Sequence, residues 1–246
     1  MKTMRDHSEE VTYVQEEQGE LLNPFGAPFF IEQIENGEEI ADRFCDLARQ
    51  LRSEEDNGGM VSNAWREAKL AKSQEDYEKY GFTSFATSNL IEDSRADFLH
   101  EAIAKQMGKF LDIIATKKSY LTIINSWATI YGEGHYVPEH IHPNAQLSCV
   151  FYGDASPDTG KLVFKNPMYQ SYAMNYDQRF GLYCDSFFVQ PKKGMMVIFP
   201  SFLPHYTTAH EDKKERIICS ANANLSTDRK MNEHFSQDGK GNKHGE

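Results

Sequence analysis

Residues 120–131 read "YLTIINSWATIY", and from here on the chain consists of short runs rich in β-branched and aromatic residues. Further runs of this kind are QLSCVFY (146–152), KLVFK (161–165), SFFVQ (186–190), MMVIF (195–199) and RIICSANANL (216–225). Gly, Pro, Asn and Asp turns separate them, as expected of strands. Strands at this spacing after a helical block predict an α+β fold, in which a β barrel or double-sheet jelly roll carries helices on one sheet.

The helical block precedes these strands. In "NGEEIADRFCDLARQLRSEE", residues 36–55, the apolar positions 40, 44, 47 and 51 share one helical face. A second helical run, "DSRADFLHEAIAKQMGKFLDIIATKK" at 93–118, follows a Ser or Asp cap. The sequence therefore predicts two principal helices before residue 120, with a short strand at 27–34 in front of them.

Length and composition predict a single domain with additional segments. The 246 residues divide into a flexible acidic tail at 1–21, a single domain at 22–225 and a flexible tail at 226–246. Within the domain the helical block covers about 37–118 and the jelly-roll core about 119–225. The four cysteines form no C-x-x-C pair, and we interpret them as reduced thiols.

Charge and hydropathy exclude several classes of partner. The formal net charge of −11, from 37 acidic and 26 basic residues, opposes binding to a nucleic acid backbone. No apolar run approaches the roughly 18 to 20 residues of a membrane span. The charged N-terminus lacks the apolar stretch of a secretory signal, so a cytoplasmic location is expected.

A histidine pair stands where one of the strand runs begins, in "HYVPEHIHPNAQLSCVFY" at 135–152. On an extended strand His140 and His142 would point to the same side, so one cation could bind both. His205, after a strongly apolar strand and a Pro-bounded turn, is the candidate third ligand. The spacing alone is equally compatible with two polar residues at a strand end.

Arg216 opens the last predicted strand, eleven residues after His205. A guanidinium that points into a barrel could bind a carboxylate through two parallel hydrogen bonds. The alternative is that Arg216 only ends the charged "EDKKER" turn and is exposed to solvent.

An ordered set of segments resembles a known family. "TIYGEGHYVPEHIHP", "LSCVFY", "GKLVFKNP", "KKGMMVIFPSFLPHYT" and "ERIICSANANL" are similar, in that order, to the core of the 2-oxoglutarate- and Fe(II)-dependent oxygenases, and most similar to a little-characterised subgroup with a His-x-His-Pro motif. The resemblance covers residues 24–225 or so. It implies a double-stranded β-helix, Fe(II) and 2-oxoglutarate as cofactors, and hydroxylation with release of succinate and CO2. The acidic balance of the chain and its single lid-like loop predict that the substrate is a small molecule.

The resemblance also implies roles for individual residues. His140 and His205 match the two histidines of the family's metal-binding triad, and His142 stands where the family has an acidic residue. Arg216 matches the basic residue that binds the far carboxylate of 2-oxoglutarate. Tyr131 resembles a strand tyrosine that bonds the same carboxylate, although an aromatic residue packed inside the barrel is the alternative.

The missing acid at position 142 leaves the metal site open to interpretation. Three neutral imidazoles supply one negative charge fewer than the usual triad. Adjacent Glu139 would point to the other side of an extended strand unless the strand bulges there. Two other hypotheses remain. Either His140 and His205 alone bind the metal, with His142 beside them, or the site binds no metal.

The long segment at 166–186 is the candidate substrate loop, because loops of this length in compact domains commonly act as lids or binding loops. It carries the candidate contacts Tyr169, Tyr172, Tyr176 and Arg179. The alternative places these side chains on the outside of the barrel, at a homodimer interface. Three rival functions remain: a cupin-type three-His dioxygenase, a three-His zinc enzyme, and a noncatalytic jelly-roll binding protein.

Overall fold

The computed structural model describes residues 26–54, 81–85, 88–115, 117–169 and 185–227, together with the backbone of 20–22. The predicted tail at 1–21 and the predicted tail at 226–246 lie almost entirely outside these ranges. Within the ranges, no helix is long and apolar enough to cross a membrane.

Two antiparallel sheets form the described core. The larger sheet has seven strands in the order β1-β2-β8-β5-β10-β4-β3, and the smaller has three in the order β7-β6-β9. The large-sheet strands are β1 (Glu20–Leu22), β2 (Phe29–Gln33), β3 (Phe82–Thr83), β4 (Tyr120–Tyr131), β5 (Leu147–Asp154), β8 (Met195–Pro200) and β10 (Arg216–Ser226). The small-sheet strands are β6 (Leu162–Lys165), β7 (Ser186–Val189) and β9 (His205–Thr207).

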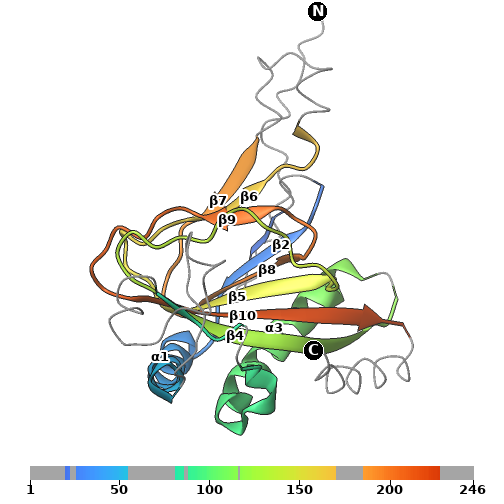
Figure 1. The fold of residues 1–246 in the computed structure, drawn as a ribbon. Helices are drawn as coiled ribbons and strands as arrows, with labels where there is room; N and C mark the ends of the chain where they lie inside the picture. The colour runs from blue at the N-terminus through green and yellow to red at the C-terminus, as the bar shows by residue number, and fades with distance from the viewer. Residues whose placement is uncertain are drawn as a thin grey trace, which may run out of the picture.

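The helices cover one face of the large sheet. In Figure 1, α1 (Gly37–Glu54) and α3 (Asp97–Ile114) lie on one side of that sheet, and β6, β7 and β9 lie on the other. The short helices η3 (Leu90–Glu92) and η4 (Ser94–Ala96) lead into α3. The predicted α+β architecture, with helices packed on one sheet, is confirmed.

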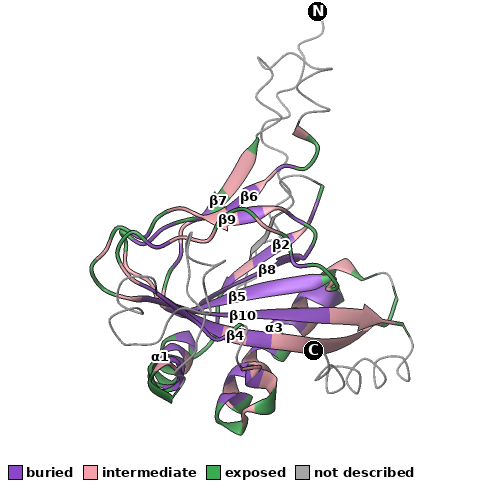
Figure 2. Cartoon of the chain, viewed as in Figure 1, coloured by how far each residue is buried: buried purple, intermediate pink, exposed green. Residues whose placement is uncertain are grey.

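Strand alternation divides the apolar residues into two cores. Along β10, Ile217, Cys219 and Ala221 pack into the core under α1 and α3. Ile218 packs into the second core, between the two sheets. Successive side chains on a strand point to opposite faces, so one central strand supplies both cores. Figure 2 shows that buried residues predominate along β5, β8 and β10 and along the second half of β4.

The strand runs are reproduced almost residue for residue. Five predicted runs correspond to β4, β5, β6, β7 and β8, and the last corresponds to β10, which extends to Ser226. The three-residue β1 and β9 and the two-residue β3 were not predicted, because so few residues carry no periodic signal. Glu20 and Leu21 of β1 fall within the stretch 1–21 that was predicted to be a tail. Cys45, Cys149 and Cys219 are buried free thiols, as expected; Cys184 lies outside the described residues.

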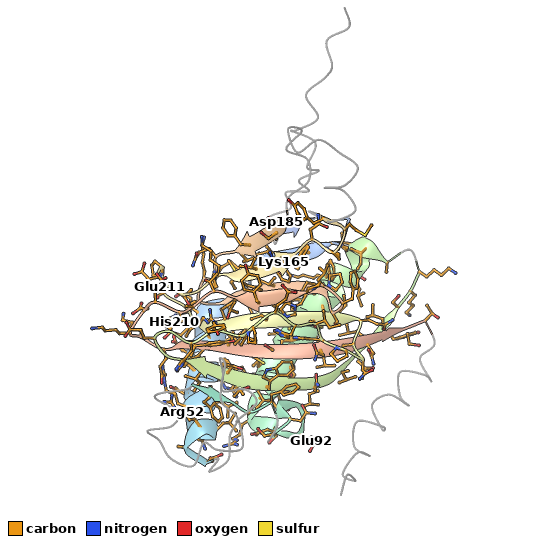
Figure 3. All side chains as sticks on the ribbon, turned by 45° about the horizontal axis from the view of Figure 1, so that its top comes forward. Arg52, Glu92, Lys165, Asp185, His210 and Glu211 are labelled. Atoms are coloured by element: carbon orange, nitrogen blue, oxygen red, sulfur yellow. The ribbon has the colours of Figure 1, made fainter. Side chains whose placement is uncertain are left out.

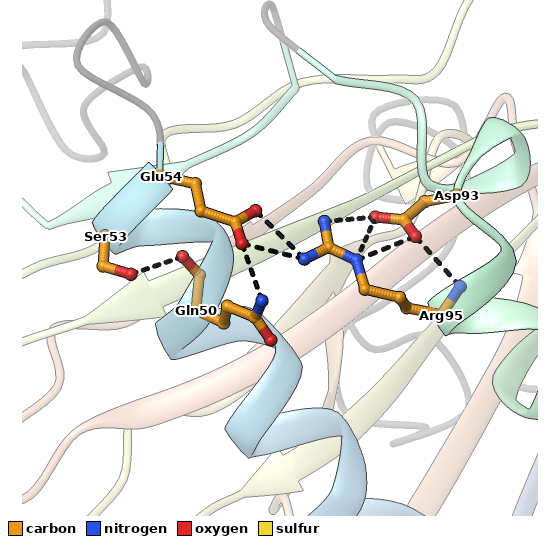
Figure 4. Close-up of polar contacts among 5 residues, drawn as sticks. All are labelled: Gln50, Ser53, Glu54, Asp93 and Arg95. Atoms are coloured by element: carbon orange, nitrogen blue, oxygen red, sulfur yellow. Dashed lines mark hydrogen bonds and ion pairs between the residues drawn. The ribbon is translucent and has the colours of Figure 1, made fainter.

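Ion pairs fasten the helices and the edges of the sheets. Arg95 of η4 bonds both Asp93 and Glu54, the last residue of α1, as Figure 4 shows. Lys165 of β6 lies 3.8 Å from the carboxylate of Asp185, next to β7; both are labelled in Figure 3. Exposed pairs of this kind contribute at most about 1 kcal/mol each, so apolar packing carries the stability.

The first prediction concerns the core beneath α1. Phe44 is fully buried, and its ring lies 6.2 Å from that of Phe151 on β5. We expect Phe44→Ala to lower the free energy of unfolding by about 3–5 kcal/mol, because the cavity that it leaves cannot collapse fully. Urea denaturation measures the change.

Phe188 on β7 provides the matched control, because its side chain is 58% exposed. Phe188→Ala should lower the free energy of unfolding by less than about 1 kcal/mol. Equal losses for the two variants would contradict the proposed packing of α1 against the sheet.

Candidate metal and cosubstrate site

Backbone pairing brings two of the histidines together. The segment before His140 runs antiparallel to β9, and His140 and His205 exchange reciprocal N–H···O bonds of 2.9 Å each. Val137 and Thr207 continue the same pairing. Residues 65 positions apart in the sequence are thereby fixed as direct neighbours at the edge of the small sheet.

His142 completes the cluster from a turn held by the other sheet. Its backbone N–H donates to the carbonyl of Ser201, just after β8, at 3.0 Å. The Nε2 atoms of His140 and His142 then lie 3.2 Å apart. One ligand atom from each of the three histidines lies within 4.8 Å of the others, and these are the only clustered metal-binding side chains among the residues described.

The far side of each imidazole is hydrogen-bonded in a way that selects its tautomer. Nδ1 of His140 and Nδ1 of His205 each lie 2.8 Å from a backbone carbonyl oxygen, those of Pro138 and Leu203. A carbonyl only accepts, so both Nδ1 atoms must carry the proton. Both Nε2 lone pairs are thus left free to bind a cation.

His142 is oriented by side chains instead. Its Nδ1 lies 2.6 Å from Oδ1 of Asn222 and 2.9 Å from the Ser148 hydroxyl. Ser148 also donates to Asn222 Oδ1 and bonds the Ser201 hydroxyl. Asn222, Ser148 and Ser201 were not predicted as site residues. Their types are ordinary strand and turn residues, and only the fold shows that they meet.

Burial keeps the three imidazoles uncharged. Desolvation is the main cause that lowers the pKa of each ring, to about 4 for His142 and well below the ordinary value for His205. Mutual repulsion between the rings adds to the shifts of His142 and His205. Neutral imidazole is the form that binds a metal.

The separation of the His140 and His142 nitrogens fits a shared transition metal. Two imidazole nitrogens bound at about 2.1 Å lie about 3.0 Å apart at right angles and about 3.4 Å apart in a tetrahedron, and the 3.2 Å observed lies between these values. No carboxylate of the described residues joins the cluster. Glu139 is exposed and does not belong to it.

A cavity of about 500 Å³ opens onto the three histidines. Side chains of β4 and β10 form one wall, and residues of β6 and β9 contribute to the other. The volume lies within the range typical of small-molecule sites. The cluster therefore lies at a partly open cavity between the two sheets.

Arg216 is buried directly behind the wall of this cavity. Its side chain is 1% exposed, and Tyr131, which lines the cavity, covers it with its ring, whose centroid lies 3.8 Å from the guanidinium carbon. Nη1 donates to the carbonyl of Gly160, but Nε and Nη2 have no partner among the described residues. A buried cation without a counter-ion is costly, so this position suits an anion. The exposed alternative for Arg216 does not apply.

The predicted substrate loop is mostly outside the described structure. Tyr172, Tyr176 and Arg179 lie there. Tyr169 is half-buried, its N–H donates to the carbonyl of Asn166, and it does not line the cavity.

Comparison with known proteins adds family and fold evidence. A family model described as "Putative 2OG-Fe(II) oxygenase" matches residues 125–222, which include the three histidines and Arg216. The non-heme alpha ketoglutarate dependent epimerase SnoN from nogalamycin biosynthesis is 13% identical with a TM-score of 0.53, over 79% of this chain and 75% of that one. No curated protein matches the chain.

A second solved structure has the same fold. It is a prolyl hydroxylase from Trichoplax adhaerens in complex with a hypoxia inducible factor peptide fragment, 11% identical with a TM-score of 0.51, over 85% of this chain and 86% of that one. The two-sheet core described above is accordingly a double-stranded β-helix.

The second prediction tests the residue that orients His142. Asn222→Leu removes the acceptor closest to Nδ1 and should weaken divalent metal binding about 10- to 100-fold, as loss of such supporting contacts does. Competition of Co(II) with a chelator measures the affinity. Asn224→Leu, the same change on the same strand away from the cavity, should leave it unchanged. Equal affinity in both variants would show that Asn222 does not support the site.

Proposed function

Because the chain belongs to the superfamily of 2-oxoglutarate- and Fe(II)-dependent oxygenases, we propose that it hydroxylates a small-molecule metabolite with release of succinate and CO2. The observation that carries the proposal is the three-imidazole cluster at the cavity between the two sheets. When bound, Fe(II) and 2-oxoglutarate supply the oxidising power, and one oxygen atom of O2 enters the substrate C–H bond while the other ends in succinate.

Three histidines of the chain would bind the metal. His140, His142 and His205 would hold the metal through Nε2, since hydrogen bonds occupy each Nδ1. Three neutral ligands leave the full double charge of the cation in place. The site therefore holds the metal less strongly than a site with a carboxylate, but attracts an anionic cosubstrate more strongly.

Arg216 distinguishes the use of 2-oxoglutarate from simple metal binding. Its Nε and Nη2 are free to form two parallel bonds to the distal carboxylate, and Tyr131 lies at the same point of the wall. A three-His dioxygenase that needs no 2-oxoglutarate is the alternative that the absent acid favours. Such an enzyme would have no use for a buried, unpaired arginine.

A small molecule suits a cavity of about 500 Å³ and the acidic balance of the chain better than a nucleic acid does.

The third prediction tests the reaction class. The purified full-length protein with Fe(II), 2-oxoglutarate and O2 should form succinate, measured by mass spectrometry, and His205→Ala should form no more than a sample without protein. His210→Ala serves as control, because His210 is a buried histidine outside the metal cluster. Substrate oxidation without succinate would favour the three-His dioxygenase instead.

The fourth prediction concerns Arg216. Arg216→Ala removes one partner of a buried charge pair and should weaken 2-oxoglutarate binding by roughly 2–5 kcal/mol, while iron stays bound. Arg216→Lys should recover only part of the loss, because a point charge cannot reproduce two parallel bonds. The visible absorption that 2-oxoglutarate gives with Fe(II) follows the titration.

Arg49→Ala is the control, since Arg49 pairs with Glu215 on the outer surface next to Arg216. Unchanged affinity in Arg216→Ala, with native circular dichroism, would refute the cosubstrate assignment.

A further inference from the structure

The wall of the cavity beside the histidines is neutral. Within the described ranges, no Asp, Glu, Lys or Arg side chain lines the cavity, although such residues make up 26% of the chain. A charged ligand group would find no partner there other than the metal and Arg216, which the cosubstrate occupies. The part of the substrate that this wall contacts is therefore uncharged.

An aromatic pair forms one side of this wall. Trp127 of β4 and Phe85 meet edge to face with ring centroids 4.8 Å apart, and both line the cavity. The Trp127 ring also lies 5.6 Å from the ring of His142. Phe85 and Ile141 remain 46% and 47% exposed at the cavity. Flat apolar surfaces this close to the metal ligands suit a flat apolar group.

A β-bulge places an amide beside this pair. Asn222 of β10 pairs with Asn125 of β4, but the next residue, Ala223, pairs with Ile123, so Ile124 is an extra residue. Both Ile124 and Asn125 consequently line the cavity, although neighbours on a regular strand face opposite sides. Asn125 follows the alternation of Trp127, Thr129 and Tyr131, which also line the cavity, so the bulge adds Ile124 to this face next to the residue that orients His142.

Asn125 carries a hydrogen-bond acceptor that the described protein leaves unused. Its Oδ1 is buried and has no partner, and of all such atoms in the described residues only this one belongs to a residue that lines the cavity. The hydroxyls of Thr83 and Thr129 in the same wall bond each other. A buried acceptor without a partner is costly, so its presence calls for a donor from a ligand.

We propose that Asn125, Trp127 and Phe85 form a substrate-recognition site for a neutral, flat, largely apolar group that carries one N–H or O–H donor. The assignment rests on the function proposed above, because the group must lie beside the metal ligands to be oxidised. The donor bonds Oδ1 of Asn125, and the ring of the substrate packs against the two aromatic side chains.

Two isomers probe this site: 3-methylindole, which has an N–H, and 1-methylindole, which has none. Calorimetric titration of the iron-loaded full-length protein under argon, with 2-oxoglutarate present, measures both. The wild type should bind 3-methylindole roughly three- to ten-fold more tightly, the ratio expected for one neutral hydrogen bond. Equal affinities, or binding of neither isomer, would overturn the proposal.

Two variants separate the hydrogen bond from the aromatic wall. Asn125→Leu should abolish the preference between the isomers, whereas Asn224→Leu, outside the cavity, should retain it. Trp127→Leu should weaken the binding of both isomers alike, so the ratio of their affinities should stay the same. A preference that survives in folded Asn125→Leu would contradict the role of Oδ1, and the comparison of isomers in the wild type stands even if that variant does not fold.

The same titration without iron and 2-oxoglutarate distinguishes this site from the proposed function. An isomer preference that persists in a protein that makes no succinate would uphold the recognition site and refute the oxygenase assignment. Succinate formation by a protein that binds both isomers equally would support the oxygenase assignment and refute the recognition site.

Discussion

The backbone pairing between His140 and His205 is the constraint on which the site depends. Two reciprocal hydrogen bonds fix these residues opposite each other, at the point where the small sheet meets the segment that follows β4. Backbone bonds do not depend on side-chain identity, so the two imidazoles are positioned before any metal is bound. Pre-organisation of this kind lowers the conformational entropy that metal binding must overcome.

Strand β10 couples this site to the rest of the fold. One face of the strand packs into the core under the two helices, through small and apolar side chains such as Cys219 and Ala221. The other face carries Arg216, Ser220 and Asn222, all of them buried. A strand this well packed on one side cannot slip in register without moving every polar residue on the other. The alternation of side chains along β10 thus both packs the core and positions the polar residues of the site.

Asn222 links the metal site to the cavity wall. Its side chain orients His142 through Nδ1, and its backbone pairs with Asn125 where the β-bulge begins. The ligand that replaces the expected carboxylate is therefore supported by the strand pair that shapes the neighbouring wall. The three neutral imidazoles thus lie beside a cavity wall without charged side chains among the described residues.

The sequence by itself determined the fold class, the two principal helices and most strands, because periodicity and turn residues are local properties. It also singled out His140, His142, His205 and Arg216 as candidates, through an ordered resemblance of motifs. Where the structure places them, three imidazoles meet and the guanidinium is buried.

Only the tertiary structure decided what surrounds these residues. Short β9, the bond of Asn222 to His142 and the bulge that turns Ile124 to the cavity beside Asn125 all arise from contacts between segments far apart in the chain. A bulge has no sequence signature of its own, and an asparagine on a strand looks the same whether or not its oxygen finds a partner. Register between strands, which no local pattern encodes, converts ordinary residues into a site.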